Sequence, residues 1–273
     1  MRRIVVCADD YALAPGVSKA IRALIEQGRL NATSVMTVVP GFATEAAVLA
    51  MTVSPLRFET GLHVTLTGPF RPLAAAQLAS EDGNFPPLAK LLNPLAWFRI
   101  DRRAVESEVG AQMRAFTDAF GRPPDFVDGH QHVQLFPGVR EGFLAAVARF
   151  APKAWVRQCD PANWRALLSS DAKTRFLALL SFGFRRKAAR AGLRFNPAFA
   201  GAYDFGADEN FAALFARFLE GLPAGGLVMC HPGFVDAELK ARDPLTDRRE
   251  AEYAFFASDQ FPQALARAGA TLS

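Results

Sequence analysis

The chain has 273 residues, 51% of them hydrophobic, which is enough to bury a sizeable core and excludes a disordered protein. Its net charge of +4, with 31 basic against 27 acidic residues, is too small an excess to indicate a nucleic-acid partner. The three cysteines contain no CxxC pair, which excludes a disulfide framework.

The N-terminal half alternates short apolar runs, typical of buried strands, with helical patterns. In chain order, these patterns predict a strand over Ile4–Ala8, a helix over Pro15–Gln27, a strand over Ser34–Val39, a helix from after Gly41 to Met51 and a strand over Thr60–Leu66. Residues 68–100 are irregular and rich in Pro, Gly and Asn, which indicates an excursion near a functional site.

The alternation continues after Asp101, which is expected to cap a helix that ends at Gly121. Strands are predicted over Phe126–Val133, Ala154–Gln158, Arg194–Phe199 and Leu227–Cys230, with Ala270–Leu272 as a last strand closing the sheet. Further helices are predicted over Val139–Phe150, within residues 163–193, over Asn210–Leu222 and over Arg248–Ala268.

Such alternation predicts an α/β fold with a mostly parallel sheet covered by helices. With neither internal repeats nor an obvious linker, one domain spanning residues 1–273 is the simplest interpretation. The pattern alone does not separate a closed or irregular (β/α) barrel from an open, doubly wound sheet.

The position of the polar residues is more informative than their number. Asp9 and Asp10 follow the first strand, and all four histidines lie at carboxyl ends of predicted strands. In parallel α/β folds this edge of the sheet carries the active site. We therefore expect these side chains, drawn from distant parts of the sequence, to converge at one rim; they are Asp9, Asp10, His63, Asp128, His130, His132 and His231.

Each motif also has a structural interpretation. One of the paired aspartates could serve only as a helix cap, and a single His63 in an apolar strand is more often a hydrogen-bonded core residue. Asp128, His130 and His132 are harder to explain in this way, because on a strand all three would face the same side. A set of carboxylate and imidazole groups suits a divalent first-row metal with positions open to water and substrate. The chain contains no GxGxxG, Walker or GxSxG motif that would favour nucleotide binding or a serine hydrolase.

Four motifs together resemble those of the YdjC-like carbohydrate deacetylases, the family of the chitooligosaccharide deacetylases, over essentially the whole chain. They are Ala8-Asp9-Asp10-Tyr11 with Pro15-Gly16-Val17, Gly61-Leu62-His63-Val64-Thr65-Leu66-Thr67, Asp128-Gly129-His130-Gln131-His132-Val133, and His231-Pro232-Gly233. One branch of this family is associated with hopanoid biosynthesis, and no motif places the chain in that branch.

The resemblance implies an irregular β/α barrel that hydrolyses an N-acetyl group of an amino sugar with Mg²⁺ or Zn²⁺ bound. Carried over by motif, Asp10, His63 and His130 hold the metal. Asp9 is then the general base and His231 the general acid. Asp128 and His132 are expected to orient these groups without binding the metal. Other amide or phosphoester hydrolysis, and sugar binding without turnover, remain as alternatives.

The expected partner is a carbohydrate or glycolipid substrate, and a homodimer contact is left open. The N-terminus turns acidic too early for a secretory signal and no run is long and apolar enough to span a bilayer, so a cytoplasmic location is expected. The basic, aromatic stretch from Arg175 to Arg194 has two interpretations. It could contact an acidic lipid surface or a phosphorylated substrate, or it could be a helix that covers the barrel with solvated charges or forms a dimer contact, which is the preferred interpretation.

Overall fold

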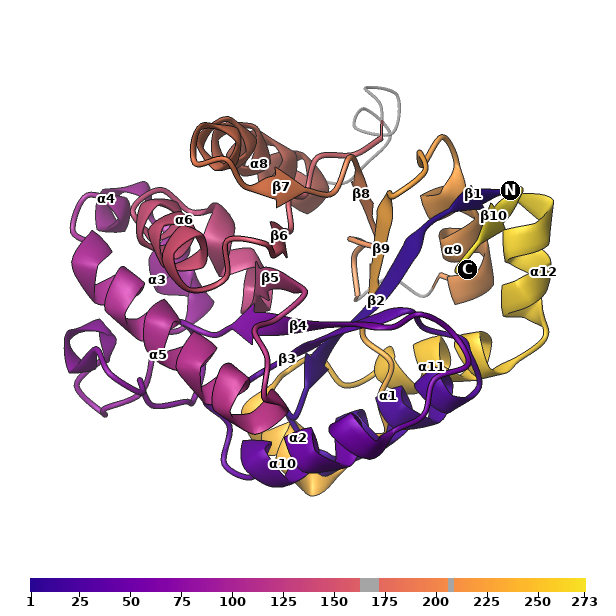
Figure 1. Ribbon diagram of the computed structural model, residues 1–273, viewed down its shortest axis with the longest axis horizontal. Coiled ribbons are helices and arrows are strands. Elements are labelled where there is room, and N and C mark those ends of the chain that lie inside the picture. Colours follow the sequence, from indigo (N-terminus) through magenta and orange to yellow (C-terminus); the bar gives the residue numbers. More distant parts are fainter. Residues whose placement is uncertain (163–171, 206–208) are drawn as a thin grey trace.

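The centre of the molecule is a single curled sheet of parallel strands (Figure 1). The computed structural model describes residues 1–162, 172–205 and 209–273. The strand order is β7-β6-β5-β4-β3-β2-β9-β8, and every pairing is parallel. The strands are β2 (Val5–Tyr11), β3 (Ala32–Val35), β4 (Glu59–Val64), β5 (Phe126–Gly129), β6 (Trp155–Val156), β7 (Arg194–Phe195), β8 (Phe199–Ala200) and β9 (Leu227–Cys230).

Consecutive strands from β2 to β7 pair with each other, as do β8 and β9, and the first strand of this sheet, β2, pairs with the last, β9; β7 and β8 do not pair with each other. The sheet is therefore an irregular barrel, open between β7 and β8, which confirms the predicted fold class. A sheet wound in this order brings the carboxyl ends of all its strands to one rim.

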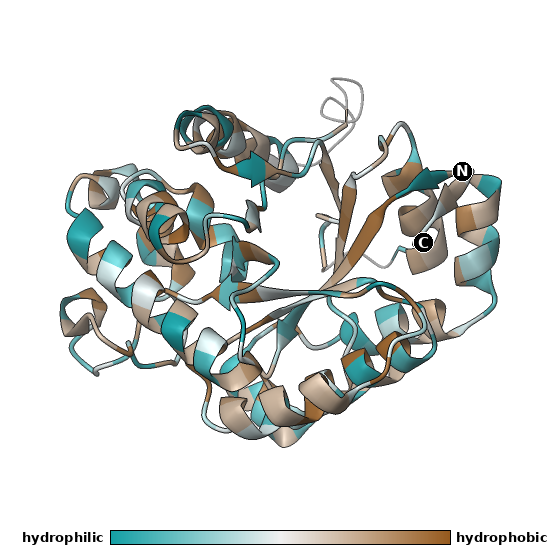
Figure 2. Ribbon diagram, viewed as in Figure 1, coloured by the Kyte–Doolittle hydropathy of each residue, from teal (hydrophilic) through white to brown (hydrophobic). Residues whose placement is uncertain are grey.

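Helices form a layer around the sheet (Figure 1). The longer ones are α1 (Pro15–Glu26), α2 (Phe42–Met51), α5 (Arg102–Phe120), α6 (Val139–Phe150), α8 (Ala172–Arg190), α9 (Phe211–Leu219), α11 (Arg249–Ala257) and α12 (Gln260–Arg267). The short ones are η1 (Ala76–Leu78), α3 (Leu88–Leu92), α4 (Pro94–Trp97), η2 (His130–Leu135) and α10 (Ala237–Arg242). Figure 2 shows hydrophobic residues along β2 and β9, while the surrounding helices carry hydrophilic residues on their outer sides.

Local chemistry accounts for many of the boundaries. The Asp101 side chain accepts hydrogen bonds from the backbone N–H groups of Arg103 and Ala104, and Gly121 adopts a left-handed conformation with φ 66°, so α5 begins and ends as predicted. No helix in the described ranges is long and apolar enough to cross a membrane.

Several predicted elements are wrong in detail. The strand predicted over Ser34–Val39 is β3, which spans Ala32–Val35. Strand β5 ends at Gly129, because Gln131 and His132 have φ values of 53° and 57°, which no regular strand allows. The predicted last helix is two helices, because Ser258 is extended and its hydroxyl accepts the N–H of Gln260. Strand β10 (Ala270–Thr271) pairs with β1 (Arg2–Arg3) in a separate two-stranded sheet and does not close the barrel.

The predicted strand Arg194–Phe199 is also wrong as a single element. It consists of β7 and β8, which lie at opposite edges of the sheet. Of the helical stretch predicted within residues 163–193, the structure describes α8, and residues 163–171 lie outside the described residues.

Candidate active site

Strand β2 does not stop before the paired aspartates but runs through them. Asp10 has a φ of 66°, and the register with β3 shifts between Ala8 and Tyr11. In a regular strand, successive side chains point to opposite faces, and a bulge of this kind re-aims one of them. The bulge lets both carboxylates serve one rim site, where Asp9 and Asp10 are 2% and 1% exposed.

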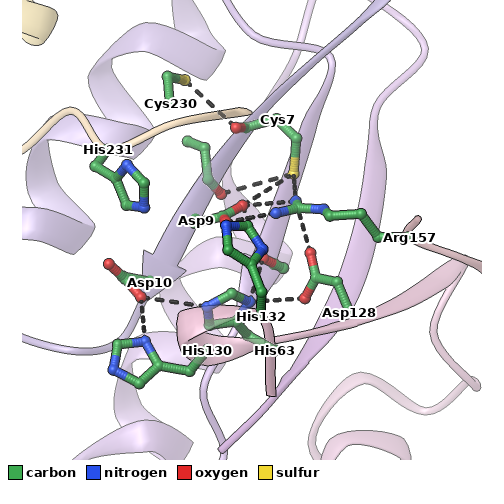
Figure 3. Close-up of polar contacts among 12 residues, drawn as sticks. Cys7, Asp9, Asp10, His63, Asp128, His130, His132, Arg157, Cys230 and His231 are labelled. Atoms are coloured by element: carbon green, nitrogen blue, oxygen red, sulfur yellow. Dashed lines mark hydrogen bonds and ion pairs between the residues drawn. The ribbon is translucent and has the colours of Figure 1, made fainter. Parts of the chain in front are cut away.

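Asp10, His63 and His130 come together as the sequence predicted (Figure 3). The Asp10 Oδ1 atom lies 2.9 Å from His130 Nδ1 and 3.3 Å from His63 Nε2. One ligand atom from each residue lies within 4.8 Å of the others, all three residues are buried, and the ring centroids of the two imidazoles are 5.6 Å apart. This is the spacing that a single small cation requires.

The other oxygen of Asp10 is held by an arginine. Arg249, at the start of α11, donates from Nη2 to Asp10 Oδ2 at 2.7 Å, and its side chain is fully buried. This contact leaves Oδ1 of Asp10 facing the two imidazoles. Burial would raise the pKa of Asp10, but Arg249 and His130 outweigh it and hold this pKa well below its usual range.

Neighbouring strands hold His63 in place. His63 on β4 is in register with Asp128 on β5, and its Nδ1 atom lies 2.7 Å from Asp128 Oδ1 and 3.0 Å from the Ser34 hydroxyl. With Nδ1 engaged, Nε2 is the ring nitrogen directed at Asp10. Burial would lower the pKa of His63, but Asp128 and Asp10 raise it to about 10. The pocket therefore has an excess of negative charge that favours a cation.

A buried arginine, Arg157, lies between Asp9 and Asp128. Its guanidinium contacts both oxygens of Asp9, at 2.5 and 2.6 Å, and Oδ2 of Asp128 at 2.6 Å. Burial raises the pKa of Asp9, but the charge of Arg157 outweighs this effect and lowers the pKa to about 2. The carboxylate of Asp9 is therefore ionised throughout the neutral pH range.

Asp9, Asp128 and Cys7 form a second close group of metal-binding residue types. The Arg157 guanidinium also lies 3.1 Å from Cys7 Sγ, so it contacts all three members of this group. A permanent cation already pairs with both carboxylates and with the sulfur, and we do not assign a metal to them.

His231 follows β9, and Cys230 is in register with Ala8, which places His231 beside the aspartates (Figure 3). Its backbone N–H donates to Glu252 Oε2 at 2.6 Å, and its ring meets Phe205 edge to face with centroids 5.4 Å apart. The ring Nδ1 atom is buried and has no hydrogen-bond partner in the described structure. Burial lowers the pKa of His231 to about 4, so the imidazole is neutral at pH 7.

His132 does not share a face with His130, contrary to the sequence prediction, because the strand has already ended. Its Nδ1 atom lies 3.6 Å from Cys159 Sγ, and its ring meets Phe199 edge to face at 5.7 Å. Its predicted supporting role stays a prediction.

Sequence reasoning missed Arg157, Arg249, Ser34 and Glu252. Arg157 carries a recognisable signal, because it lies near the carboxyl end of a predicted strand, where the other site residues also lie. Arg249 and Glu252 belong to a charged helix whose pattern is that of any amphipathic helix, and nothing in the sequence marks them as buried.

The sequence profile of the YdjC-like protein family matches residues 3–267, almost the whole chain. The chain belongs to this family. A human carbohydrate deacetylase is 33% identical over 254 residues, covering 85% of this chain and 75% of the human protein. The carbohydrate deacetylase of Mus musculus is also 33% identical over 254 residues and is covered over 78% of its length.

A solved structure shares the fold of this YdjC-like chain. It is a protein of Enterococcus faecalis V583 described as a cellobiose-phosphate cleavage protein, with a TM-score of 0.77 and 20% identity. The match covers 100% of this chain and 97% of that one. At this identity the likeness establishes the architecture alone.

Proposed function

We propose that this YdjC-like chain is a metal-dependent deacetylase that hydrolyses the N-acetyl group of an amino-sugar-containing substrate. The observation that carries the proposal is the buried convergence of Asp10, His63 and His130 beside Asp9 and His231. The names of the human and mouse relatives support a carbohydrate amide as the substrate.

The donor set fits a divalent metal. One carboxylate oxygen and two imidazole nitrogens match catalytic zinc sites, in which three protein ligands leave a position open, whereas Mg²⁺ prefers oxygen ligands. We therefore favour Zn²⁺ over Mg²⁺. When bound there, such a cation supplies Lewis-acid polarisation of the acetyl carbonyl and lowers the pKa of a water molecule.

The protein's own residues supply proton transfer and positioning. Asp9, kept ionised by Arg157, is proposed to accept a proton from the attacking water. The oxygen of that water forms a bond to the amide carbon and the C–N bond breaks. His231, whose ring is neutral at rest, is proposed to take up the proton removed from the water and to pass it to the leaving nitrogen. The products are acetate and the free amine, and Asp128 and Ser34 keep the His63 ring in its orientation throughout.

Two substitutions test the proposal. Asp9→Asn is expected to keep the metal and lose on the order of a hundredfold or more in rate, whereas His63→Ala is expected to lose both. Metal content measured by mass spectrometry, together with acetate release from an N-acetylglucosamine oligomer, distinguishes these outcomes. Asp118→Asn, a matched change at an exposed position on α5, serves as the control. Full activity in Asp9→Asn would end the assignment of the base.

The same assay, extended to phosphate release and sugar binding, distinguishes two alternative functions. Phosphate release without acetate release would identify a metal-dependent phosphoesterase. Saturable binding of the sugar without any turnover, in protein shown to contain metal, would identify a binding barrel. The proton-transfer pair beside the metal ligands favours turnover, because a binding protein has no need of it.

A further inference from the structure

Helix α8 has an outer stripe that combines large apolar side chains with arginines. The stripe follows helical spacing along one side of the helix and consists of Arg175, Leu179, Phe182, Arg186 and Arg190. Leu179 and Phe182 are 71% and 59% exposed, whereas the opposite side of the helix, including Phe184, is buried against the barrel. The helix therefore covers the barrel with one side, and its other side is not covered by any residue that the structure describes.

The charge of this stripe is entirely positive. Residues 172–194 contain seven basic residues and no acidic one, against a net charge of +4 for the whole chain, so the rest of the molecule is net acidic. Arg185 and Lys187 pair with Asp160 and Glu141. The three stripe arginines form no ion pair in the described ranges, and Arg186 lies over the Phe182 ring, 5.9 Å from its centroid.

A second apolar and basic segment, residues 90–103 around α4, is linked to α8 through Phe136. Around α4, the side chains of Leu95 and Phe98 are 72% and 88% exposed. Trp97 packs on Phe136, and Phe136 packs on Phe176 of α8, at centroid distances of 6.3 Å in both cases. In Figure 1, α4 and α8 lie on either side of α6 along one edge of the molecule. Basic residues in this segment also lack ion pairs among the described residues; they are Lys90, Arg99, Arg102 and Arg103.

We propose that the α8 stripe, extended by the α4 segment, docks on the surface of a bilayer containing anionic phospholipid. Apolar side chains flanked by arginines, with no acidic residue in 172–194 and only the helix cap Asp101 among the basic residues around α4, suit the boundary between acyl chains and negatively charged headgroups. A helix face that is only solvated would be expected to carry polar residues between its arginines, whereas this one carries the exposed Leu179 and Phe182. The proposal does not depend on deacetylation, since none of these residues belongs to the candidate active site.

Docking would bring the molecule to the membrane by one edge. Phe136, the link between α4 and α8, directly follows η2, and η2 begins with His130. The helix that carries the stripe and the candidate site are therefore connected through a single short segment of chain.

The experiment is co-sedimentation of the full chain with vesicles of phosphatidylcholine alone or with about one third phosphatidylglycerol. We expect binding to the anionic vesicles only, weakened by high salt. Each basic residue near such a surface is worth roughly fivefold in binding, so Arg175→Gln/Arg186→Gln/Arg190→Gln is expected to bind on the order of a hundredfold more weakly. Leu179→Ser/Phe182→Ser is expected to bind more weakly with its charge unchanged.

A triple variant with the same charge change elsewhere is the matched control. Lys19, Arg57 and Arg267 are exposed, form no ion pair in the described structure and lie outside α8 and the segment around α4. Lys19→Gln/Arg57→Gln/Arg267→Gln should therefore bind nearly as the wild type does. Equal loss in both triple variants, or equal binding to neutral vesicles, would overturn the proposal. So would a dimer in light scattering that Leu179→Ser/Phe182→Ser abolishes, because the stripe would then bind a second copy.

Discussion

Two adjacent carboxylates in this site are held by two different arginines, and the difference separates their roles. Arg157 contacts both oxygens of Asp9, whereas Arg249 contacts only Oδ2 of Asp10. Asp9 thus has its charge compensated by a guanidinium, while Asp10 keeps one oxygen facing His63 and His130. This asymmetry explains why the second aspartate, and not the first, is suited to bind a cation.

Removing Arg249 should therefore weaken metal binding without removing a ligand. Groups that orient a metal ligand typically contribute 10–100-fold in affinity, and we expect Arg249→Gln to lose about that much. Competition with a fluorescent zinc chelator measures the affinity directly. Arg267→Gln, on the surface of α12, is the control. Unchanged affinity in Arg249→Gln would mean that Asp10 is held in position by other contacts.

Removing Arg157 should change stability in a pH-dependent way. The pKa of Asp9 is lowered from 3.8 to about 2, so its pairing stabilises the fold above about pH 4 and is lost as the pH falls through 2. Arg157→Met removes the guanidinium that pairs with the buried carboxylates of Asp9 and Asp128, and breaking a buried ion pair in this way typically costs about 3–5 kcal/mol. The difference in unfolding free energy between wild type and Arg157→Met should be largest near pH 7 and shrink below pH 4.

Urea unfolding at several pH values provides the measurement, with the exposed Arg149→Met as control. A difference that stays constant down to pH 2 would contradict the ion-pair account and indicate a loss of packing alone.

For individual residues, the sequence could predict which side chains lie at the rim of the sheet, but not which residues pair with them there. The four histidines and Asp9-Asp10 are visible as polar residues that end apolar strands. The bulge at Asp10 is not visible, because a positive φ at an aspartate depends on the tertiary contacts that hold it. The ion pairs of Arg157 and Arg249 join residues far apart in sequence, and a basic residue has the same appearance in a sequence whether it is buried or solvated.

The segment carrying His231 is held between two helices. From α1, the Gly16 carbonyl accepts the N–H of Phe234, and a Cβ on Gly16 would lie 2.3 Å from the Phe234 carbonyl oxygen, so only glycine fits there. From α11, Glu252 accepts the backbone N–H of His231 and, at 2.7 Å, the Tyr203 hydroxyl. The Pro-Gly-Val and His-Pro-Gly motifs, distant in sequence, are thus two sides of one contact.

Glu252 is therefore expected to position His231 rather than to react. Glu252→Ala should lower kcat by about tenfold or more with metal content unchanged, because the backbone of His231 loses its anchor. Acetate release and metal analysis are measured together, with Glu26→Ala on the exposed end of α1 as control. Partial recovery in Glu252→Gln, whose amide oxygen can still accept the N–H, would support the positioning role. Equal loss of metal and activity would instead show a collapse of the site.

Helix boundaries were easier to predict than strand ends, for a physical reason. Caps such as Asp101 and Gly121 act within a few residues, so the sequence contains the whole signal. The end of β5 depends on the left-handed residues Gln131 and His132, which long-range packing imposes. The helical α8 was predicted, but the exposure of Leu179 and Phe182 follows only from how the helix is docked.

In the whole molecule, the two ends of the barrel contribute differently: one carries the candidate site and the other contributes to stability. The candidate site lies at the carboxyl ends of the strands, where bulges and positive φ values occur. At the other end, Asn31 precedes β3 and joins three backbone segments: its Oδ1 accepts the N–H of Val6, and its Nδ2 donates to the carbonyls of Ile4 and Leu272. In barrels of this kind, this end serves stability rather than chemistry.

Asn31→Ala should therefore reduce stability while leaving catalysis intact. Three buried backbone groups would lose their partner, at a total cost of about 3 kcal/mol, which corresponds to a fall in Tm of roughly 5–10 °C. Because Asn31 contacts none of the candidate catalytic residues, kcat at 25 °C is expected to stay within about twofold of wild type. Thermal unfolding measures the change in Tm, and acetate release measures kcat. Asn84→Ala, in a surface loop, controls for the loss of an amide side chain. A large fall in kcat at unchanged metal content would show that the two ends of the barrel are coupled.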